Sequence, residues 1–471
     1  AARAPRRGLP PPQAAYAGSG DAPPARRSKS DLRAEVYRAA DALGAAESAL
    51  SLRRAADRTD GAANPHLRAA RRLRDLCAAN GGAYVKVGQH LAALDYLLPA
   101  EYNHVLRALF DDVPRSEYAD VREVVREELG AYPEELFSRF DETPIASASL
   151  AQVHVAADKK DPARLYAVKV QHRGLRERSY GDVRVVRAAV GMVERMFQNF
   201  KFGWLASEIA PQLLYELDFT REGKNAERAE RHMREAGIKE DDCIVPKIYW
   251  EYTAPRVLCM SYEPGFKSTD MEAIQKAGLR PRDISKIISS VFNKQIFHSG
   301  FVHCDPHPAN VLLRPHPHKK GKPQMVLVDH GLYKEIDDRF RLAYARLWQA
   351  MVLADIDAIR SICETMGVRD MYPLLAAMLT ARPFDEILDK AGRRSPSDSV
   401  TVSAEGDAAM LRGYAEKYAV EIADMLDAVP RPMLLLFKTN DCLRHIDTAL
   451  GRPRDAAGAA GKEAAGAVRR H

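Results

Sequence analysis

The chain of 471 residues has no long hydrophobic run and few cysteines, and each shortage narrows the classes of protein that fit. No window approaches about 18 uninterrupted apolar residues, so the sequence predicts no membrane-spanning helix. The six cysteines are scattered without any C-x-x-C pair. This pattern indicates buried or idle thiols and argues against a disulfide framework or a zinc site.

An excess of positive charge is also missing from the body of the chain. The formal net charge is +6, but residues 1–30 contribute +5 and residues 451–471 contribute +3, which leaves −2 for the rest. A nucleic-acid-binding domain should carry its basic residues clustered on the folded part. We therefore expect no nucleic-acid partner.

Both ends of the chain are predicted to be disordered. Residues 1–30 are rich in Ala, Pro and Arg, and residues 452–466 in Ala and Gly, without apolar periodicity. The first segment is Arg-rich and poor in acids, so a transit-peptide remnant and a plain low-complexity tail both fit. The predicted organisation is a disordered or targeting-like segment, a helical N-terminal extension, a β-rich lobe with a helical insert, a helical lobe and a disordered tail, over residues 1–62, 63–139, 140–263, 264–450 and 451–471.

Local patterns predict the main elements. Asn64-Pro65 predicts the start of a helix that ends at Asn80-Gly81-Gly82, and a second helix should run from Tyr118 to Leu129, stopped by Gly130. A stripe at helical spacing predicts core, at Phe340, Tyr344, Leu347 and Met351. Further helices are expected at about 174–200 and 204–235, and strands near residue 140 and at 152–155, 165–170, 244–251 and 257–262.

The most informative stretch is His303-Cys304-Asp305-Pro306-His307-Pro308-Ala309-Asn310, with Val326-Leu327-Val328-Asp329-His330-Gly331 after it. Phosphoryl transfer from ATP needs one carboxylate near the acceptor proton, here Asp305. It also needs an amide and a second carboxylate to hold Mg²⁺, here Asn310 and Asp329. Taken alone, the pattern also fits small-molecule kinases, or a turn rich in Asp, Asn and Pro.

A second set of motifs lies upstream. Leu165–Val170 has the strand–Lys form in which Lys169 supplies a point charge for the α/β-phosphates of ATP. The run Ala146-Ser147-Ala148-Ser149-Leu150-Ala151 stands where a typical kinase has a Gly-rich loop. Ala and Ser restrict the backbone where Gly would not. The run therefore predicts a different hold on nucleotide, with Ser147 or Ser149 near phosphate, or else a small-residue β-turn.

Together with Lys86-Val87-Gly88-Gln89, Glu216-Leu217-Asp218 and Glu222, these motifs resemble the UbiB (aarF-domain-containing) family of atypical kinases, and within it the aarF-domain-containing kinase 1 type. The resemblance runs from about residue 63 to about 445. It implies an α+β, protein-kinase-like two-lobed fold with a helical extension packed over the active site. It also implies ATP and Mg²⁺ as cofactors, and links to mitochondrial or plastid prenyl-quinone and lipid metabolism.

The resemblance assigns further residues. Glu222 would orient Lys169, and the nucleotide-binding set would comprise Ala146, Ser147, Ala148, Ser149, Lys169, Glu222, Ser261 and Glu263. Lys86 and Gln89 would enter the cleft as a regulatory lid facing Glu216 and Asp218. Such a charge-complementary lid should exclude proteins and favour a small or lipid substrate, or hold the enzyme off.

Several positions depart from a typical kinase. His330 replaces the usual Phe of the metal-binding triplet, Cys304 replaces the catalytic-loop Arg, and no Ala-Pro-Glu follows Gly331 within about 30 residues. Regulation by activation-loop phosphorylation and an ordinary protein kinase are therefore disfavoured. His303 is expected to pack behind the loop, and the His-rich stretch 315–322 to form an exposed hairpin loop rather than a metal site.

Two functions remain in competition. The first is an ATP-dependent kinase or ATPase that acts on a small-molecule or lipid substrate and supports mitochondrial prenyl-quinone or lipid homeostasis. The second is a catalytically silent nucleotide-binding pseudokinase scaffold. The intact set Lys169, Glu222, Asp305, Asn310 and Asp329 favours the first. The expected location is the mitochondrion, with the plastid as the alternative. A membrane surface is a candidate partner through the Arg-rich helix 66–77, although a solvated face is favoured.

Overall fold

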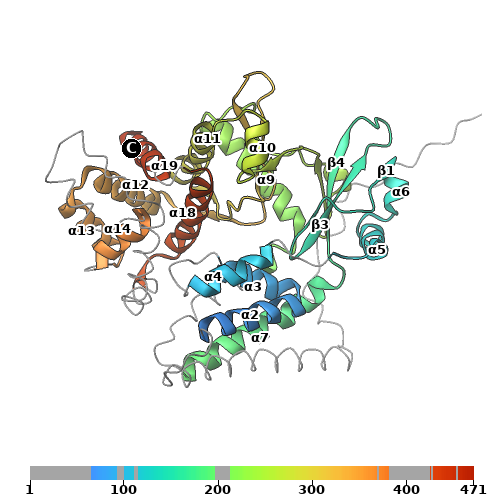
Figure 1. Ribbon diagram of the computed structural model, residues 1–471, viewed down its shortest axis with the longest axis horizontal. Helices are drawn as coiled ribbons and strands as arrows, with labels where there is room; N and C mark the ends of the chain where they lie inside the picture. The colour runs from blue at the N-terminus through green and yellow to red at the C-terminus, as the bar shows by residue number, and fades with distance from the viewer. Residues whose placement is uncertain are drawn as a thin grey trace, which may run out of the picture.

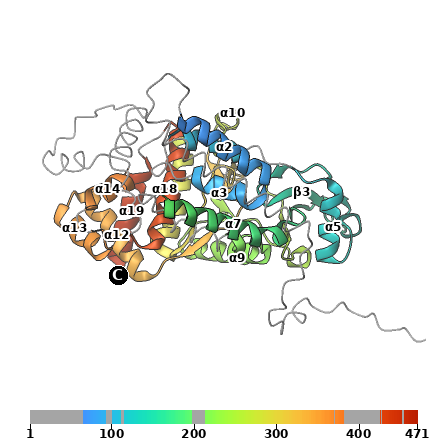
Figure 2. The same ribbon diagram turned by 90° about the horizontal axis from the view of Figure 1, so that it is seen from below.

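The computed structural model describes residues 65–92, 100–110, 115–196, 213–368, 371–380, 425, 428–451 and 455–470. A β-rich lobe and a larger helical lobe lie at opposite ends, and an N-terminal helical extension lies between them (Figure 1). Seen from below, helices α2 (Pro65–Asn80), α3 (Gly82–Ala92) and α7 (Leu175–Met196) cover the middle of the molecule (Figure 2). Residues 1–62, for which a disordered or targeting-like segment is predicted, lie outside the described ranges.

The small lobe is built on an antiparallel sheet of order β1-β3-β4-β6, with β2 paired to β3. Its strands are β1 (Arg139–Phe140), β2 (Ala146–Ser147), β3 (Ala151–Ala157), β4 (Leu165–Gln171) and β6 (Val257–Ser261). Helix α5 (Tyr118–Leu129) packs on one face through Val121, Val124 and Val125, and short helix α6 (Pro133–Leu136) follows. Gly130 ends α5 in the left-handed conformation, as predicted.

The large lobe is mainly helical. Phe340, Tyr344, Leu347 and Met351 are all buried in its largest core cluster, which confirms the predicted stripe. Two small sheets lie beside the helices, β5-β10-β9-β7 and β11-β8. The helices are α10 (Met271–Lys276), α11 (Pro281–Lys294), the π-turn η4 (Gln295–Ser299), α12 (Asp338–Leu353), α13 (Ile356–Thr365), α14 (Tyr372–Thr380), α18 (Arg431–Ala449) and α19 (Asp455–Arg470). The strands are β5 (Cys243–Ile244), β7 (Phe266–Lys267), β8 (Phe301–His303), β9 (Val311–Pro315), β10 (Pro323–Leu327) and β11 (Tyr333–Glu335).

The extension consists of α2 (Pro65–Asn80), α3 (Gly82–Ala92), α4 (Ala100–Leu106) and the turn η2 (Arg107–Phe110). The first helix has the predicted bounds, and Gly81 follows it with a φ of 66°. Cys77, Tyr84, Val85, Leu106 and Leu109 form a separate small core. Helix α7 (Leu175–Met196) packs against α3, so the extension has its own scaffold and also touches the kinase-like body.

The predicted disordered tail 451–471 is wrong over its longest part. Residues 455–470 form α19, whose Ala460, Ala464 and Ala467 are buried against the large-lobe core. The spacing of these alanines places them on one helix face. Small side chains let two helices approach closely: a Cβ on Gly461 would lie 2.5 Å from Val352 Cγ2. Composition suggested disorder because this face is mainly alanine, with Val468 as the larger apolar residue beside it.

Two other predicted elements need correction. The helix expected over 204–235 is interrupted within its described part, because residues 216–218 form a turn before α9 (Phe219–Glu235). Asp218 caps α9 by accepting the N–H of Thr220, which ends one helical segment and starts another. The strand expected over 244–251 is reduced to β5, an isolated bridge at Ile248 and the turn η3 (Trp250–Tyr252).

None of the six cysteines forms a disulfide; five are buried and Cys442 is half-buried. The stretch 316–322 forms the loop of the β9–β10 hairpin, as predicted, and the described residues include no cluster of three His, Cys, Asp or Glu suited to a metal ion. Across the described ranges, every helix is too short or too polar to span a bilayer.

Candidate active site

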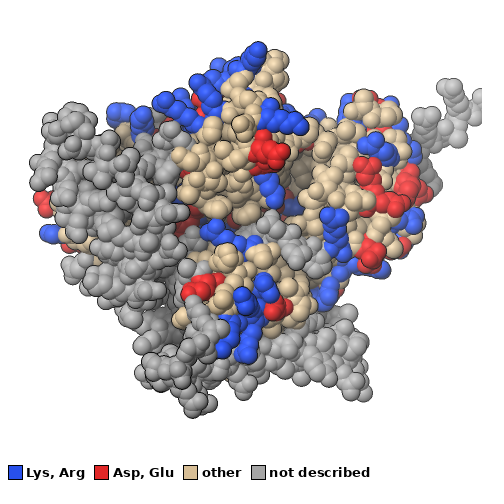
Figure 3. Space-filling model, viewed as in Figure 1, with Lys and Arg blue, Asp and Glu red and all other residues tan. Residues whose placement is uncertain are grey.

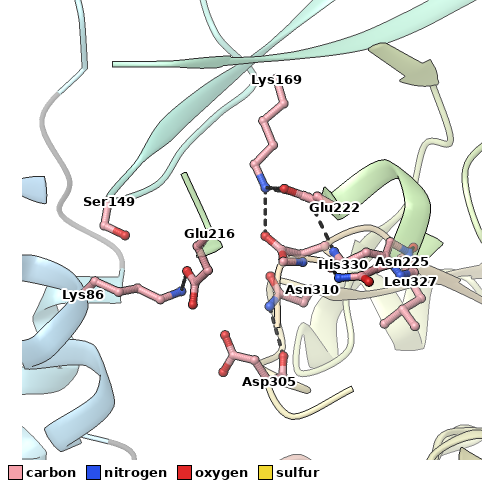
Figure 4. A network of polar contacts seen from close by, with 12 residues as sticks. Lys86, Ser149, Lys169, Glu216, Glu222, Asn225, Asp305, Asn310, Leu327 and His330 are labelled. Carbon is pink, nitrogen blue, oxygen red and sulfur yellow. Dashed lines mark hydrogen bonds and ion pairs between the residues drawn. The ribbon is translucent and has the colours of Figure 1, made fainter. Parts of the chain in front are cut away.

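Lys169 extends from β4 towards the large lobe. Its neighbours Val168 and Val170 are buried on the opposite face of the sheet, because side chains alternate along a strand. The Lys169 Nζ donates to both carboxylate oxygens of Glu222 at 2.7 and 2.9 Å, and to Oδ2 of Asp329 at 3.1 Å (Figure 4). The structure therefore joins the three residues that the sequence assigned to one site.

Close packing fixes Glu222 in the first turn of α9. The next residue is Gly223, where a Cβ would lie 2.9 Å from the ring of Trp250. Glu222 itself is 3% exposed, and the backbone N–H of His330 lies 3.5 Å from its Oε1. Helix α9 is thereby held against both the small-lobe sheet and the turn that follows Asp329.

The charges of this trio influence one another. Burial raises the pKa of Glu222 to about 7, although Lys169 acts in the opposite direction. Burial also favours neutral Asp329, but Lys169 and Lys86 outweigh it and hold the pKa of Asp329 well below its usual range. The carboxylates likewise keep the pKa of Lys169 above its ordinary value, against the effect of burial. Asp329 is thus ionised at neutral pH, where Glu222 titrates.

His303 supports the loop between β8 and β9 from behind. It is fully buried, with Nε2 at 2.7 Å from the carbonyl oxygen of Asp329, and its Nδ1 accepts the N–H of Asp305 at 3.1 Å. Burial lowers the pKa of His303, so the imidazole is neutral. The prediction that His303 packs and hydrogen-bonds behind the loop is confirmed.

Asn310 joins the two halves of the motif. The Asn310 Nδ2 donates to the backbone carbonyl oxygen of Asp305 at 3.0 Å. The backbone carbonyl oxygen of Asn310 accepts the N–H of Val328 at 3.1 Å. Because the amide is planar, anchoring the nitrogen also fixes the direction of Oδ1. Figure 4 shows Asn310 between Asp305 and His330.

His330 stands where a typical kinase has Phe, and polar contacts fix it. Its Nδ1 lies 2.9 Å from the hydroxyl of Tyr333 and its Nε2 lies 3.0 Å from the carbonyl of Leu327. Burial lowers the pKa of His330 to about 3, so the ring is neutral. A neutral ring can donate at Nε2 and accept at Nδ1, which satisfies both contacts. Asn225 Nδ2 donates to the His330 carbonyl at 3.0 Å.

Lys86 enters the site from the extension. Its Nζ lies 2.7 Å from Oε2 of Glu216, and the two side chains are only 15% and 6% exposed. Although burial acts against the ammonium, the carboxylates of Glu216, Asp305 and Asp329 raise the pKa of Lys86 above its ordinary value. Figure 4 shows Lys86 opposite Lys169, with Glu216 and Asp305 near its end. Lys86 thus pairs with Glu216, one of the two acidic residues that were expected to face the lid.

Gln89 ties the extension to the Ala-rich loop. The Gln89 Nε2 donates to the carbonyl of Leu109 at 2.9 Å. The Ser149 hydroxyl donates to the Gln89 Oε1 in a long hydrogen bond of 3.5 Å. The loop itself is a tight hairpin turn, since Ala146 and Ser147 pair with β3 and the Ala148 N–H donates to the Ala151 carbonyl at 2.8 Å. The small-residue β-turn is therefore present, and Ser149 faces the extension.

Asp218 does not take its predicted place in the lid. Its Oδ1 accepts the N–H of Thr220 at 3.1 Å and its hydroxyl at 2.7 Å, and no contact described for it reaches Lys86 or Gln89. The turn that precedes α9 sends Glu216 towards Lys86 and uses Asp218 as the helix cap.

Ser261 and Glu263 lie at the connection between the lobes. Ser261 donates to Oε1 of Glu263 at 3.0 Å, and Arg314 of β9 lies 2.9 Å from its Oε2. Gly265 follows, where a Cβ would lie 3.0 Å from the Leu313 carbonyl. The predicted hinge is thus held to the large lobe by polar contacts and a close backbone approach.

Sequence patterns alone missed one residue of the site. Lys438 of α18 lies with its Nζ 3.0 Å from Oδ1 of Asp305, and its side chain is 7% exposed. The available signal was a lysine at the end of the apolar run Met433–Phe437, a run that α18 buries. Nothing in the spacing of the motifs links that run to the catalytic loop.

The β-rich small lobe, the helical large lobe and the Lys169–Glu222 pair facing Asp329 define a protein-kinase-like fold. Residues 108–363 match the model of the ABC1 atypical kinase-like domain. AarF domain-containing protein kinase 1 of Mus musculus is 44% identical over 386 residues, which are 82% of this chain and 71% of the relative. AarF domain-containing kinase 1 of Drosophila melanogaster is 37% identical over 386 residues, 82% and 72% of the two chains. A solved Rv3197–erythromycin complex from Mycobacterium tuberculosis is 21% identical, with a TM-score of 0.46 and coverage of 78% and 94%.

The chain belongs to the ABC1 atypical kinase family. The resemblance to aarF-domain-containing kinases, and to their kinase 1 type, is confirmed by these matches. The relatives are named as kinases, which supports phosphotransferase chemistry as the general class of activity.

Proposed function

We propose that this protein is an ATP-dependent phosphotransferase or ATPase that is restrained by its extension and acts on a small or lipid acceptor. The observation that carries the proposal is that the Lys169 ammonium donates to the carboxylates of both Glu222 and Asp329, at 2.7 to 3.1 Å. Phosphoryl transfer depends on such placement of charge more than on covalent chemistry by the protein.

The donor set fits Mg²⁺ and a nucleotide. Asn310 and Asp329 offer an amide and a carboxylate oxygen, the hard ligands that Mg²⁺ prefers. A buried oxygen beside them also lacks a partner: Oε1 of Glu216 has no hydrogen bond among the described residues, and Glu216 packs against the turn at Gly331. When bound, Mg²⁺ would neutralise phosphate charge there. Lys169, held by Glu222, would contact the α/β-phosphates.

Asp305 carries the proposed acid–base role. It accepts the acceptor's hydroxyl proton as the acceptor oxygen bonds to the γ-phosphorus, while the bond from that phosphorus to the β–γ bridging oxygen breaks and ADP leaves with the electron pair. With water as the acceptor, the same step is ATP hydrolysis.

The position of Lys86 in the lid supports a small or lipid acceptor rather than a protein. The Lys86 ammonium interacts electrostatically with Asp305 and Asp329 and forms an ion pair with Glu216. An extended peptide would have to displace this pair, whereas a small or lipid hydroxyl needs less room. Basic side chains gather on the extension in the space-filling view (Figure 3), and Arg68, Arg71 and Arg72 of α2 are exposed. They offer a surface for anionic lipid, consistent with a role in mitochondrial prenyl-quinone or lipid homeostasis.

The same pair supports a second candidate, a nucleotide-binding scaffold without turnover. An ammonium fixed at 2.7 Å from Glu216 reduces the negative charge of the site before any cation arrives. In this case nucleotide binds, the lid stays closed and no phosphate is transferred.

Label transfer from γ-labelled ATP separates these candidates. The purified chain is incubated with Mg²⁺ and anionic liposomes, with prenols in neutral liposomes, or with a mixture of unfolded proteins as acceptor. Label in lipid or prenol, or released as phosphate, supports the proposal. Label mainly in protein contradicts the acceptor class, and bound nucleotide without transfer or release favours the scaffold.

A further inference from the structure

The catalytic loop is tied to a helix that comes more than a hundred residues later in the chain. Lys438 of α18 and Asp305 of the loop form an ion pair of 3.0 Å, with side chains 7% and 17% exposed. A lysine this deeply enclosed is costly unless a carboxylate compensates it. The pair therefore belongs to the folded site rather than to a flexible surface.

The helix around Lys438 is firmly held. Met433, Leu434, Leu436 and Phe437 are buried in the large-lobe core, and Thr439 is fully buried, with its hydroxyl donating to the Leu435 carbonyl at 2.9 Å. One residue further, Asn440 donates to the hydroxyl of Tyr344 at 3.2 Å. With the backbone on both sides fixed, α18 sets where the ammonium group stands.

The catalytic loop contains no residue that is permanently cationic. Residues 303–310 contain no Lys or Arg, and position 304 is a buried Cys. His303 is neutral and faces away, towards the Asp329 carbonyl. The two other lysines of the site are paired elsewhere, Lys169 with Glu222 and Asp329, and Lys86 with Glu216. Among the contacts described for the Asp305 carboxylate, the cation is thus Lys438.

We propose that Lys438 is a positioning residue for phosphoryl transfer: through its ion pair it holds the Asp305 carboxylate in the orientation that receives the acceptor proton. This inference rests on the proposed function. Lys438 acts on the acceptor side, away from the Lys169–Glu222 pair that would hold nucleotide. Its loss should therefore slow the transfer step and leave nucleotide binding in place.

The test compares Lys438→Met, which keeps length and removes charge, with Lys438→Arg, which keeps charge. Lys319→Met is the matched control, since Lys319 pairs with Asp242 at 2.8 Å on the exposed hairpin. For each variant we would measure kcat and KM for Mg–ATP by phosphate release, ADP affinity and the melting temperature. We expect kcat to fall on the order of 100-fold in Lys438→Met, the size of a general-base contribution. ADP affinity should change less than about twofold, Lys438→Arg should recover most of kcat, and Lys319→Met should match wild type.

The Asp305→Asn background shows whether Lys438 acts through Asp305. Adding Lys438→Met there should cost no further turnover, because the group that it positions is gone. Wild-type kcat in Lys438→Met, or the same loss in both backgrounds, overturns the inference alone. Phosphate release no greater in wild type than in Asp329→Asn overturns the proposed function and this inference together. If Lys438→Met does not fold, Lys438→Gln replaces it in the same comparisons.

Discussion

Lys86 and Glu216 form an ion pair of 2.7 Å that joins the N-terminal extension to the turn before α9. Glu216 also packs against the turn after Asp329, where its Cγ lies 3.7 Å from the position of a Gly331 Cβ. One contact therefore links the lid, the turn that starts α9 and the proposed metal-binding turn. Any movement of the extension must break a nearly enclosed ion pair, which makes the pair suited to restrain turnover.

Removing the Lys86 charge should release the site. In Lys86→Ala, the ammonium that compensates the charges of Asp305 and Asp329 is gone, so Mg²⁺ meets less competition for these carboxylates. We expect phosphate release from Mg–ATP to rise, on the order of tenfold. Lys159→Ala is the control, since Lys159 contacts the Glu135 carbonyl on the exposed side of the small lobe. Unchanged or lower release in a folded Lys86→Ala chain would show that Lys86 does not restrain the site.

The close packing of α3 offers a second way to move the lid. A Cβ on Gly88 would lie 2.4 Å from Leu109 Cδ1 and 3.2 Å from Cys77 Sγ, so Gly88→Ala should push α3 away from α2 and η2. We expect it to lower the free energy of unfolding by about 1–3 kcal/mol. It should also raise phosphate release in the same direction as Lys86→Ala.

Gly191→Ala on α7 is the matched control, because nothing lies within 4 Å of its would-be Cβ. It should be neutral or stabilise the helix by up to about 1 kcal/mol. Thermal unfolding of both variants checks the pair. Equal melting temperatures would mean that the close approach at Gly88 does not constrain α3.

The affinity for Mg–nucleotide should depend on pH through Glu222. Burial raises its pKa to about 7, so the ionised form that holds Lys169 predominates above this pH and is lost below it. We therefore expect weaker binding at pH 6 than at pH 8. A binding titration across this range, beside Glu222→Gln, checks the effect, since the nucleotide's own titration is common to both. Parallel pH profiles would contradict the assignment.

Through Glu222, the free energy of unfolding should change with pH in the direction opposite to the nucleotide affinity. The folded protein keeps a proton on Glu222 to a higher pH than an unfolded glutamate, whose pKa is near 4.5. The contribution of this group to the free energy of unfolding is therefore fully present below pH 4.5 and is lost as the pH rises through 7. Between pH 6 and 8, binding and stability should move in opposite directions.

Motif chemistry predicted the centre of the site well and its surroundings poorly. Lys169 could be assigned because a lysine within an apolar strand is rare without a partner, and Asp305, Asn310 and Asp329 follow from their spacing. Lys438 could not, because an ion pair between distant segments leaves no local pattern. Asp218 was placed in the lid by the family resemblance, which gave no sign that its side chain caps α9.

For the fold, too, the sequence predicted some helices and missed others. Helices that carry an apolar stripe and are followed by a glycine of positive φ, such as α2 and α5, have the bounds that the sequence indicates. Helix α19 escaped prediction because its buried face is made of alanine, so its stability comes from close contact with the large lobe rather than from large apolar side chains. Tertiary packing decides such elements, and composition alone does not describe packing.

Phosphate release from Mg–ATP by the purified chain, beside Asp329→Asn, tests the central claim most directly. Asp329 contacts Lys169 at 3.1 Å and is the principal carboxylate proposed for Mg²⁺. The account predicts measurable release by the wild-type chain and a loss of at least about tenfold in a folded Asp329→Asn chain. Equal release from the two chains, with nucleotide still bound, would contradict catalysis at this site and leave the silent scaffold as its function.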